Sequence, residues 1–265
     1  MKYLVKSSLL ALTFAASGIV NAGMVIFDGN NGGTAKSGSV EKATGTDVGT
    51  DVRGDPLEFS VFDVYAGFST NTNLADSSFN RLIEINESSV AYQDLTPQHG
   101  GLGAFSGDAN DAFKDDTDNL ESNLVTSSSG DEVLFFNFDF SVILEKVWFN
   151  GNHTEMVANN LNGQTDASDS LFNIFYSDDG NYYQSVFGTS GLTQQAPTGQ
   201  EYLATGVTEG FNYYAIAATG WNSAPGGYIE AIKYTSVPEP GSLMLFGLGL
   251  AGLSLLRRRK NALAA

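Results

Sequence analysis

The chain has 265 residues, no cysteine and a formal net charge of -17 at neutral pH. The absence of cysteine excludes disulfides, thiolate metal sites and a cysteine nucleophile. The acidity argues against binding nucleic acid or anionic lipid headgroups, because both depend on cationic contacts. Between Gly23 and Pro240 only seven of the 13 Lys and Arg face all 30 acidic residues, a net charge of -23. This length suits one large all-β domain, or two small ones, between terminal segments.

Residues 1–22 have the organisation of an export signal. Lys2 and Lys6 form a basic start, and the stretch from Ser7 to Val20 is mostly small or apolar. It ends in Val-Asn-Ala, which places small residues where signal peptidase binds its substrate, so we predict cleavage after Ala22. The alternative, an uncleaved N-terminal anchor, is disfavoured because the apolar run is short and a cleavage site follows at once.

The segment 23–56 is predicted to be a flexible lead-in with one strand at its start, since it is rich in Gly, Thr and Asp after that strand. From residue 57 to 235 no helical period appears, and short alternating or aromatic-rich runs are separated by Gly, Asn, Asp and Ser. These runs predict strands at Leu57–Tyr65, Glu132–Phe140, Val142–Phe149, Phe211–Ala218 and Tyr228–Tyr234.

Two local features refine this expectation. A single serine, Ser141, separates two predicted strands, which is too short for a hairpin turn and predicts a bend or a bulge. Aromatic runs on both sides of Ser177–Asn181, which contains Asp-Gly, predict a β-hairpin. We therefore expect residues 57–235 to form an all-β domain, an antiparallel β-sandwich or jelly roll.

Ligand sites are only weakly indicated. An acidic segment could offer calcium its preferred oxygen ligands, and its candidates are Asp108, Asp111, Asp115, Asp116 and Asp118. A solvated acidic loop without metal is the alternative. Trp221 lies beside an asparagine in a predicted loop and is a candidate sugar contact, and packing against the domain is the favoured alternative.

No catalytic residue and no bound cofactor other than calcium is predicted. His99 and His153 are the only histidines, and neither has a nucleophile motif beside it. Paired carboxylates for glycoside hydrolysis stay open, because the separation of two acids depends on the folded structure.

The chain closes with a proline-containing tripeptide, an apolar run and a basic cluster. The run from Gly241 to Leu256 would reach roughly 24 Å as a helix, short of a hydrocarbon core of about 30 Å. Arg257, Arg258, Arg259 and Lys260 should stay cytoplasmic, which places residues 23–240 across the membrane. We predict a short transmembrane helix here.

The order of Pro238, Glu239, Pro240, apolar span and basic cluster resembles the PEP-CTERM sorting signal of Gram-negative bacteria, over residues 236–260, with 261–265 as a short tail. The resemblance implies removal of the span by exosortase, a membrane-embedded enzyme. A permanent single-pass anchor is the alternative. A sortase signal would need a Thr-Gly pair, and a rhomboid-type sorting signal a Gly-Gly pair, and neither pair stands directly before this span.

The domain itself resembles the corresponding domain of a subset of PEP-CTERM cargo proteins. The resemblance lies in the Gly-rich stretch 100–110 and in the later aromatic strands. The hairpin Tyr176–Tyr183 is also similar to galactose-binding-like (discoidin-type) jelly rolls. Such folds bind many ligands, so the fold alone does not indicate a function.

Together these features predict an exported, non-catalytic surface or extracellular-matrix protein, a biofilm or floc component of an exopolysaccharide-producing Gram-negative bacterium. The expected partners are signal peptidase, exosortase and exopolysaccharide; nucleic acid is not expected, and the membrane holds the chain only transiently, through 241–256. A carbohydrate-binding or calcium-dependent adhesive module is the alternative function. A polysaccharide-processing hydrolase is the third.

Overall fold

The structure is a computed structural model of the whole chain. It describes residues 22–27, 35–36, 39–40, 56–69, 74, 77–87, 89–95, 101–105, 120, 131–151, 172–188, 202–219 and 227–237. The predicted export signal before Ala22 and the predicted transmembrane helix therefore lie outside the described residues.

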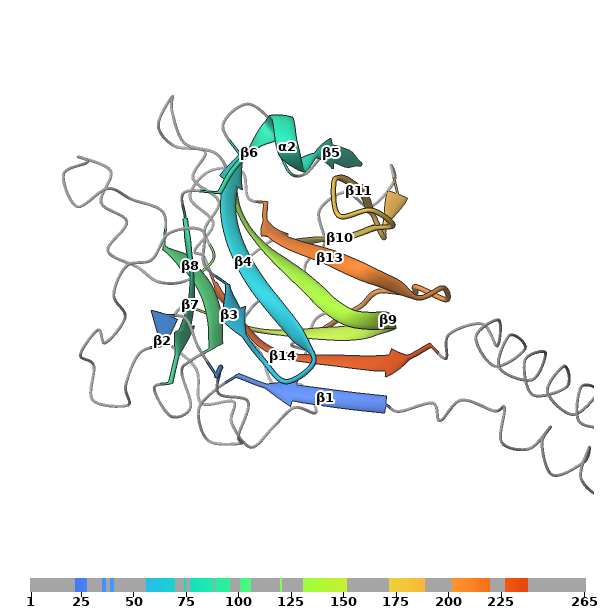
Figure 1. Ribbon diagram of the computed structural model, residues 1–265, viewed down its shortest axis with the longest axis horizontal. Helices are drawn as coiled ribbons and strands as arrows, with labels where there is room; N and C mark the ends of the chain where they lie inside the picture. Colours follow the sequence, from blue (N-terminus) through green and yellow to red (C-terminus); the bar gives the residue numbers. More distant parts are fainter. Residues whose placement is uncertain are drawn as a thin grey trace, which may run out of the picture.

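The described residues are mostly β-strand, with one short helix (Figure 1). The elements are β1 (Ala22–Ile26), β2 (Ser39–Val40), β3 (Leu57–Glu58), β4 (Phe62–Ser69), β5 (Ser78–Asn80), α2 (Arg81–Glu84), β6 (Ile85–Asn86), β7 (Val90–Asp94), β8 (Gly101–Phe105), β9 (Glu132–Gly151), β10 (Phe172–Ser177), β11 (Tyr182–Ser185), β12 (Tyr202–Ala204), β13 (Phe211–Ala218) and β14 (Gly227–Ser236). All these strands join one curled sheet, in which every pair is antiparallel except β2 with β7.

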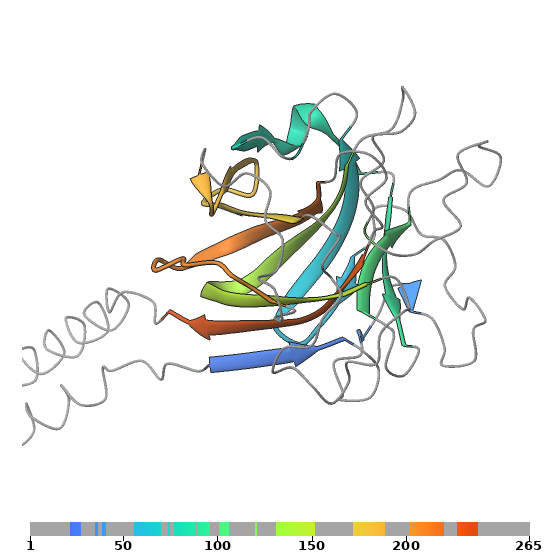
Figure 2. The same ribbon diagram turned by 180° about the vertical axis from the view of Figure 1, so that it is seen from behind.

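The long strand β9 organises the sheet, since both of its edges are occupied along both of its halves. Its first half pairs with β4 on one edge and with β13 on the other. Its second half pairs with β14 and with β12. Figures 1 and 2 show the two halves as the arms of a bend, so β9 carries the chain from one part of the curled sheet to the other.

The bend of β9 coincides with an irregular register. Phe211 of β13 pairs with Val142, whereas Tyr213 pairs with Asn137, so Asn212 alone faces residues 138–141. The Asn212 side-chain amide donates a hydrogen bond to the Phe138 carbonyl at 3.2 Å, which satisfies an acceptor that regular pairing would have used. The irregularity predicted near Ser141 is confirmed, within a strand that continues through it.

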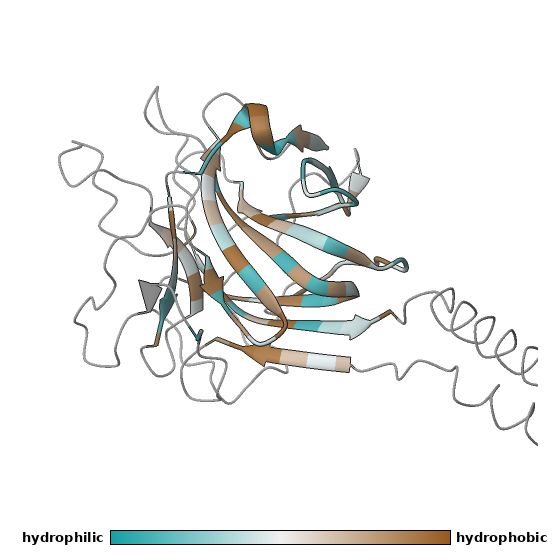
Figure 3. Cartoon of the chain, viewed as in Figure 1, coloured by the Kyte–Doolittle hydropathy of each residue, from teal (hydrophilic) through white to brown (hydrophobic). Residues whose placement is uncertain are grey.

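The side chains of β9 alternate between two apolar clusters, as the period of two of a strand requires. Leu134, Phe136 and Phe138 enter the larger cluster, while Val133 and Phe135 enter the smaller one. Figure 3 shows the corresponding bands of hydrophobic and hydrophilic residues along β4, β9 and β13. Residues 132–136 are buried on both faces of the sheet, so this part of β9 lies inside the molecule.

The segment predicted as one strand, Leu57–Tyr65, is two strands joined by a tight turn. Leu57 pairs with Val64, and the Phe59 amide donates to the Phe62 carbonyl at 2.9 Å. The rings of Phe59 and Phe62 stack with centroids 4.8 Å apart. The reversal is favoured because it brings both rings to the same face of the sheet, where each is buried.

The region predicted as a lead-in contributes β1 and β2 to the sheet. Its Phe27 is fully buried in the larger cluster. The Gln93 side chain fixes this segment by donating to the Phe27 carbonyl at 2.9 Å and accepting from the Ala35 amide at 2.8 Å. The predicted hairpin of β10 with β11 and the predicted strand Phe211–Ala218, which is β13, are confirmed.

Candidate functional site

One end of the curled sheet brings together the start of β1 and the end of β14 (Figure 1). The two strands are antiparallel neighbours, and their register runs from Ala22 opposite Thr235 to Ile26 opposite Ala231. Ala22, the predicted cleavage position, is an exposed residue at the start of β1, beside the last residues of β14. Sequence reasoning did not predict that the first and last strands of the domain would be neighbours.

The residue that follows β14, Val237, is held against the bend of β9. Its amide donates a hydrogen bond to the Ser141 carbonyl at 2.8 Å. Its side chain lies so close to Gly210 that a carbon added at that glycine would overlap both Val237 and the Ser141 hydroxyl. Gly210 is needed here because of this close approach. Ser141 and Gly210 together form the site that holds Val237. We call this pair of residues the Val237 seat.

A polar group ties β14 to β9 on the outer surface near this end. The Lys233 ammonium lies 2.7 Å from one Glu145 oxygen, and the Thr235 hydroxyl donates to the other at 2.5 Å. The hydrogen bond from Lys233, followed by that from Thr235, lowers the pKa of Glu145. Both charged side chains are partly exposed, so we assign this group a modest role in holding the strands together.

The carboxylate of Asp179 closes the turn between β10 and β11. It accepts from the amides of Asn181 at 2.8 Å and Tyr182 at 3.1 Å, and from the Ser177 hydroxyl at 3.1 Å. The two backbone amides lower the pKa of Asp179 most. Gly180, at φ 74°, supplies the left-handed residue of the turn. The Asp-Gly pair is thus explained by the turn geometry.

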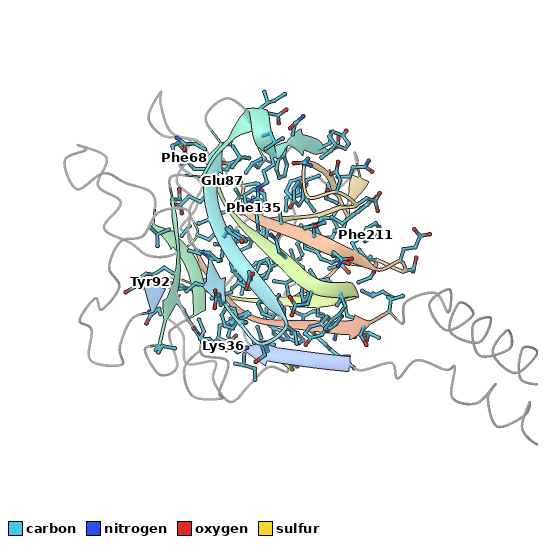
Figure 4. The ribbon with its side chains drawn as sticks, viewed as in Figure 1. Lys36, Phe68, Glu87, Tyr92, Phe135 and Phe211 are labelled. Atoms are coloured by element: carbon cyan, nitrogen blue, oxygen red, sulfur yellow. The ribbon has the colours of Figure 1, made fainter. Side chains whose placement is uncertain are left out.

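Arg81 covers the smaller apolar cluster. Its guanidinium lies 4.0 Å from the centre of the Phe135 ring and forms an ion pair with Glu87. Figure 4 shows Phe135 and Glu87 close together beside β4. The pKa of the neighbouring Tyr183 is raised to about 12, because the effect of burial exceeds the opposing effect of the nearby Arg81 charge. No sequence pattern pointed to Arg81, because Phe135 and Tyr183 lie on strands far from it in the chain.

The predicted ligand sites cannot be placed in this fold. The calcium candidates Asp108 to Asp118 and the sugar candidate Trp221 lie outside the described residues. Pro238, Glu239, Pro240 and the cluster Arg257 to Arg259 lie outside them as well. Within the described ranges, no group of three or more His, Asp or Glu side chains is placed to hold a metal ion.

The same described part of the chain contains no helix long and apolar enough to span a membrane.

Comparison with protein families shows a match at the C-terminus. The model of the PEP-CTERM protein-sorting motif matches residues 236–260. The chain carries a PEP-CTERM sorting motif. No curated protein and no solved structure matches the chain.

The PEP-CTERM motif indicates an exported protein that passes through a membrane-anchored intermediate and is processed by exosortase. Its first residue, Ser236, is the last residue of β14, and its second, Val237, occupies the Val237 seat. The folded domain and the PEP-CTERM motif therefore overlap by two residues. The candidate site is therefore the end of β14 together with the Val237 seat, where the folded domain meets the PEP-CTERM motif.

Proposed function

We propose that the protein is a non-catalytic surface or extracellular-matrix component, delivered by exosortase and released from the inner membrane when its C-terminal span is removed. The observation that carries this proposal is the PEP-CTERM motif joined directly to an acidic β-sheet domain. An acidic domain stays hydrated and is repelled by anionic lipid, which suits release into a polysaccharide matrix.

The described ionisable groups near the surface support a structural role. Asp179 closes a hairpin turn, Glu145 pairs with Lys233, and Arg81 pairs with Glu87 over an apolar cluster. Each of these charges already has a partner that explains its place in the fold. Catalytic groups more often have pKa values shifted by burial within a cleft.

We further propose that the curled sheet is a jelly-roll-like sandwich. The bend of β9 supports this, because its two halves exchange one set of neighbouring strands for another, as strands do at the corners of sandwiches. Assignment of the strand layers by solution NMR or crystallography would test it.

Fractionation tests the proposed location. Deleting residues 238–260, or the host exosortase, should shift the protein out of the surface and matrix fractions. A host that carries exosortase should yield surface or matrix material that lacks the span, as measured by intact mass. Mature surface material that retains Leu256 to Ala265 would contradict the proposal, as would hydrolysis of exopolysaccharide that one Asp or Glu substitution abolishes.

A carbohydrate-binding role is the second candidate. Tyr182 is 48% exposed at the start of β11, and the adjacent Gln184 accepts a hydrogen bond from the Tyr176 hydroxyl. An exposed aromatic ring near an amide is a common way to contact a sugar.

Pull-down of fragment 23–237 with purified exopolysaccharide separates the two roles. Saturable binding that is lost in Tyr182→Ala or Trp221→Ala would support the second candidate. Leu82→Ala is the matched control, because Leu82 is 76% exposed on the neighbouring helix α2. Absence of saturable binding would favour the purely structural role.

A further inference from the structure

The PEP-CTERM motif begins inside the folded domain. The match starts at Ser236, which pairs with Val142 of β9. Val237 then donates its amide to the Ser141 carbonyl and packs against Gly210. The tripeptide from Pro238 to Pro240 follows at once in the sequence, directly after Val237.

The end of β14 is held along both edges as far as Tyr234, which pairs with Gly23 of β1 on one side and with Leu144 of β9 on the other. Thr235 and Ser236 continue the pairing with β9. Releasing residues 235–237 would therefore break pairing with β9 as well as the Val237 seat, so this end opens only in a fraction of the molecules.

The distance from the domain to the predicted span is short. Pro238, Glu239 and Pro240 can extend over roughly 10 Å at most, at about 3.5 Å per residue. An enzyme that cuts a peptide bond must take the residues on both sides in an extended, unpaired form. Where those residues belong to a folded element, cleavage depends on the population of the opened form.

We propose that the folded domain sets the N-terminal limit of what exosortase can bind. The Val237 seat withholds the chain up to and including Val237, so exosortase can bind these residues only when the sheet opens. The mature domain consequently keeps β14 complete, and processing is slowed by the closeness of the fold. Ser141 and Gly210 act here as positioning residues, through Val237. This inference rests on processing by exosortase and is independent of a role in the matrix.

The cut itself is an ordinary acyl transfer. A peptide C–N bond C-terminal to Val237 breaks, and its carbonyl carbon passes to an O–H or N–H nucleophile, water in the simplest case. The proton released by that nucleophile goes to the nitrogen, which leaves as the amino terminus of the apolar span. No oxidant or reductant is needed.

Intact mass of the mature protein gives the first test. We expect a C-terminal residue at Val237 or beyond it, in the full chain expressed in a host that carries exosortase. The same strain without exosortase is the control and should retain the complete tail. A mature chain that ends at Ser236 or earlier would overturn the proposal, even if the protein still reached the matrix.

Processing rates give the second test. A Gly-Ser-Gly-Ser spacer between Val237 and Pro238 leaves the seat intact and moves the motif away from the fold. In a pulse–chase experiment we expect this variant to be processed about fivefold faster, the order of effect expected when one backbone hydrogen bond no longer has to open. An unchanged or slower rate would overturn the proposal, for instance because exosortase acts before the domain folds.

Gly210→Ala tests the seat itself. The added methyl group displaces Val237, so we expect faster processing than in the unaltered chain. Gly67→Ala, on β4, is the matched control, since the carbon added at Gly67 would lie 2.6 Å from the Ile85 side chain of β6. It should lower stability by overpacking as well, yet leave the processing rate unchanged. Equal rates in the two variants would contradict a positioning role for Gly210, and the spacer still decides the proposal if Gly210→Ala fails to fold.

Discussion

The Tyr214 hydroxyl illustrates how single residues stabilise the bend of β9. It donates to the Val142 carbonyl at 2.8 Å and accepts from the Leu144 amide at 3.2 Å. Its ring is fully buried in the larger apolar cluster, and burial raises the pKa of Tyr214 to about 12. One phenol thus satisfies two backbone groups of β9, on either side of Ile143.

Tyr214→Phe should lower the free energy of unfolding at pH 7 by about 1–3 kcal/mol, because two buried backbone groups lose their partner. Urea denaturation measures this. Tyr183→Phe is the comparison, since Tyr183 is equally buried but does not bridge these groups. An equal loss in the two variants would contradict the role of the Tyr214 hydroxyl.

The same tyrosines make the fold sensitive to alkali. Because the unfolded phenols ionise near pH 10 and the folded ones near pH 12, the unfolded state binds fewer protons between these values. Stability is therefore complete below about pH 10 and falls as pH rises toward 12, by about 2–3 kcal/mol for each tyrosine. Either Phe variant should show a flatter decline in this window, and an unchanged slope would contradict the assignment.

At this scale the sequence predicted residue types better than partners. The alternating run Glu132–Phe140 predicted a strand, and Asp-Gly predicted the hairpin. The bond from Tyr214 to Val142 and the stacking of Arg81 on Phe135 join residues far apart in the chain. Local patterns carry no information on such pairs, because they depend on which strands become neighbours.

At the scale of elements, β3 and β4 show what the apolar pattern did contain. Leu57 and Phe59 are buried at odd positions, and Phe62 and Val64 at even positions. The change of phase marks the turn, and one uninterrupted strand would have placed one pair on the opposite face. Reading Leu57–Tyr65 as a single alternating strand overlooked that change.

The contact between β8 and β14 offers a test of how elements assemble. A carbon added at Gly101 would lie 2.6 Å from Tyr228 Cβ and 2.8 Å from the Ile229 carbonyl oxygen. Gly101→Ala should therefore push β8 away from β14 and lower the free energy of unfolding by about 1–3 kcal/mol. Chemical denaturation measures the loss, and hydrogen exchange should show faster exchange in β7 and β8.

Leu82→Ala serves as control for Gly101→Ala, because Leu82 is largely exposed and its truncation should change stability very little. If hydrogen exchange in β7 and β8 stayed at the rate of the unaltered chain, the close packing of β8 on β14 would not be what holds these strands.

For the whole molecule, the dominant property is its acidity, with a net charge of -23 between Gly23 and Pro240. We propose that calcium raises the melting temperature by binding within the acidic segment of Asp108 to Asp118. A calcium titration of fragment 23–237 at constant ionic strength measures this, with magnesium as control for non-specific screening. If calcium changes neither the melting temperature nor the tryptophan fluorescence, the site does not exist.

The PEP-CTERM motif was the part of the function that sequence could predict, because its parts are consecutive in the chain. The all-β class was predictable for a similar reason, since strand periodicity is local. The Val237 seat was not, because Ser141, Gly210 and Val237 come from three separate segments. Their meeting depends on the bend of β9 and on the order of the strands around it.

The pairing of β1 with β14 also makes the path of the folded chain nearly a closed ring. Paired residues of antiparallel strands have Cα atoms roughly 5 Å apart, so the start at Gly23 and the end near Tyr234 are neighbours. A loop of a few residues could join them, and new ends could then be opened in another turn, such as the one at Gly180. The domain is thus suited to circular permutation, which would separate its fold from the position of its address signals.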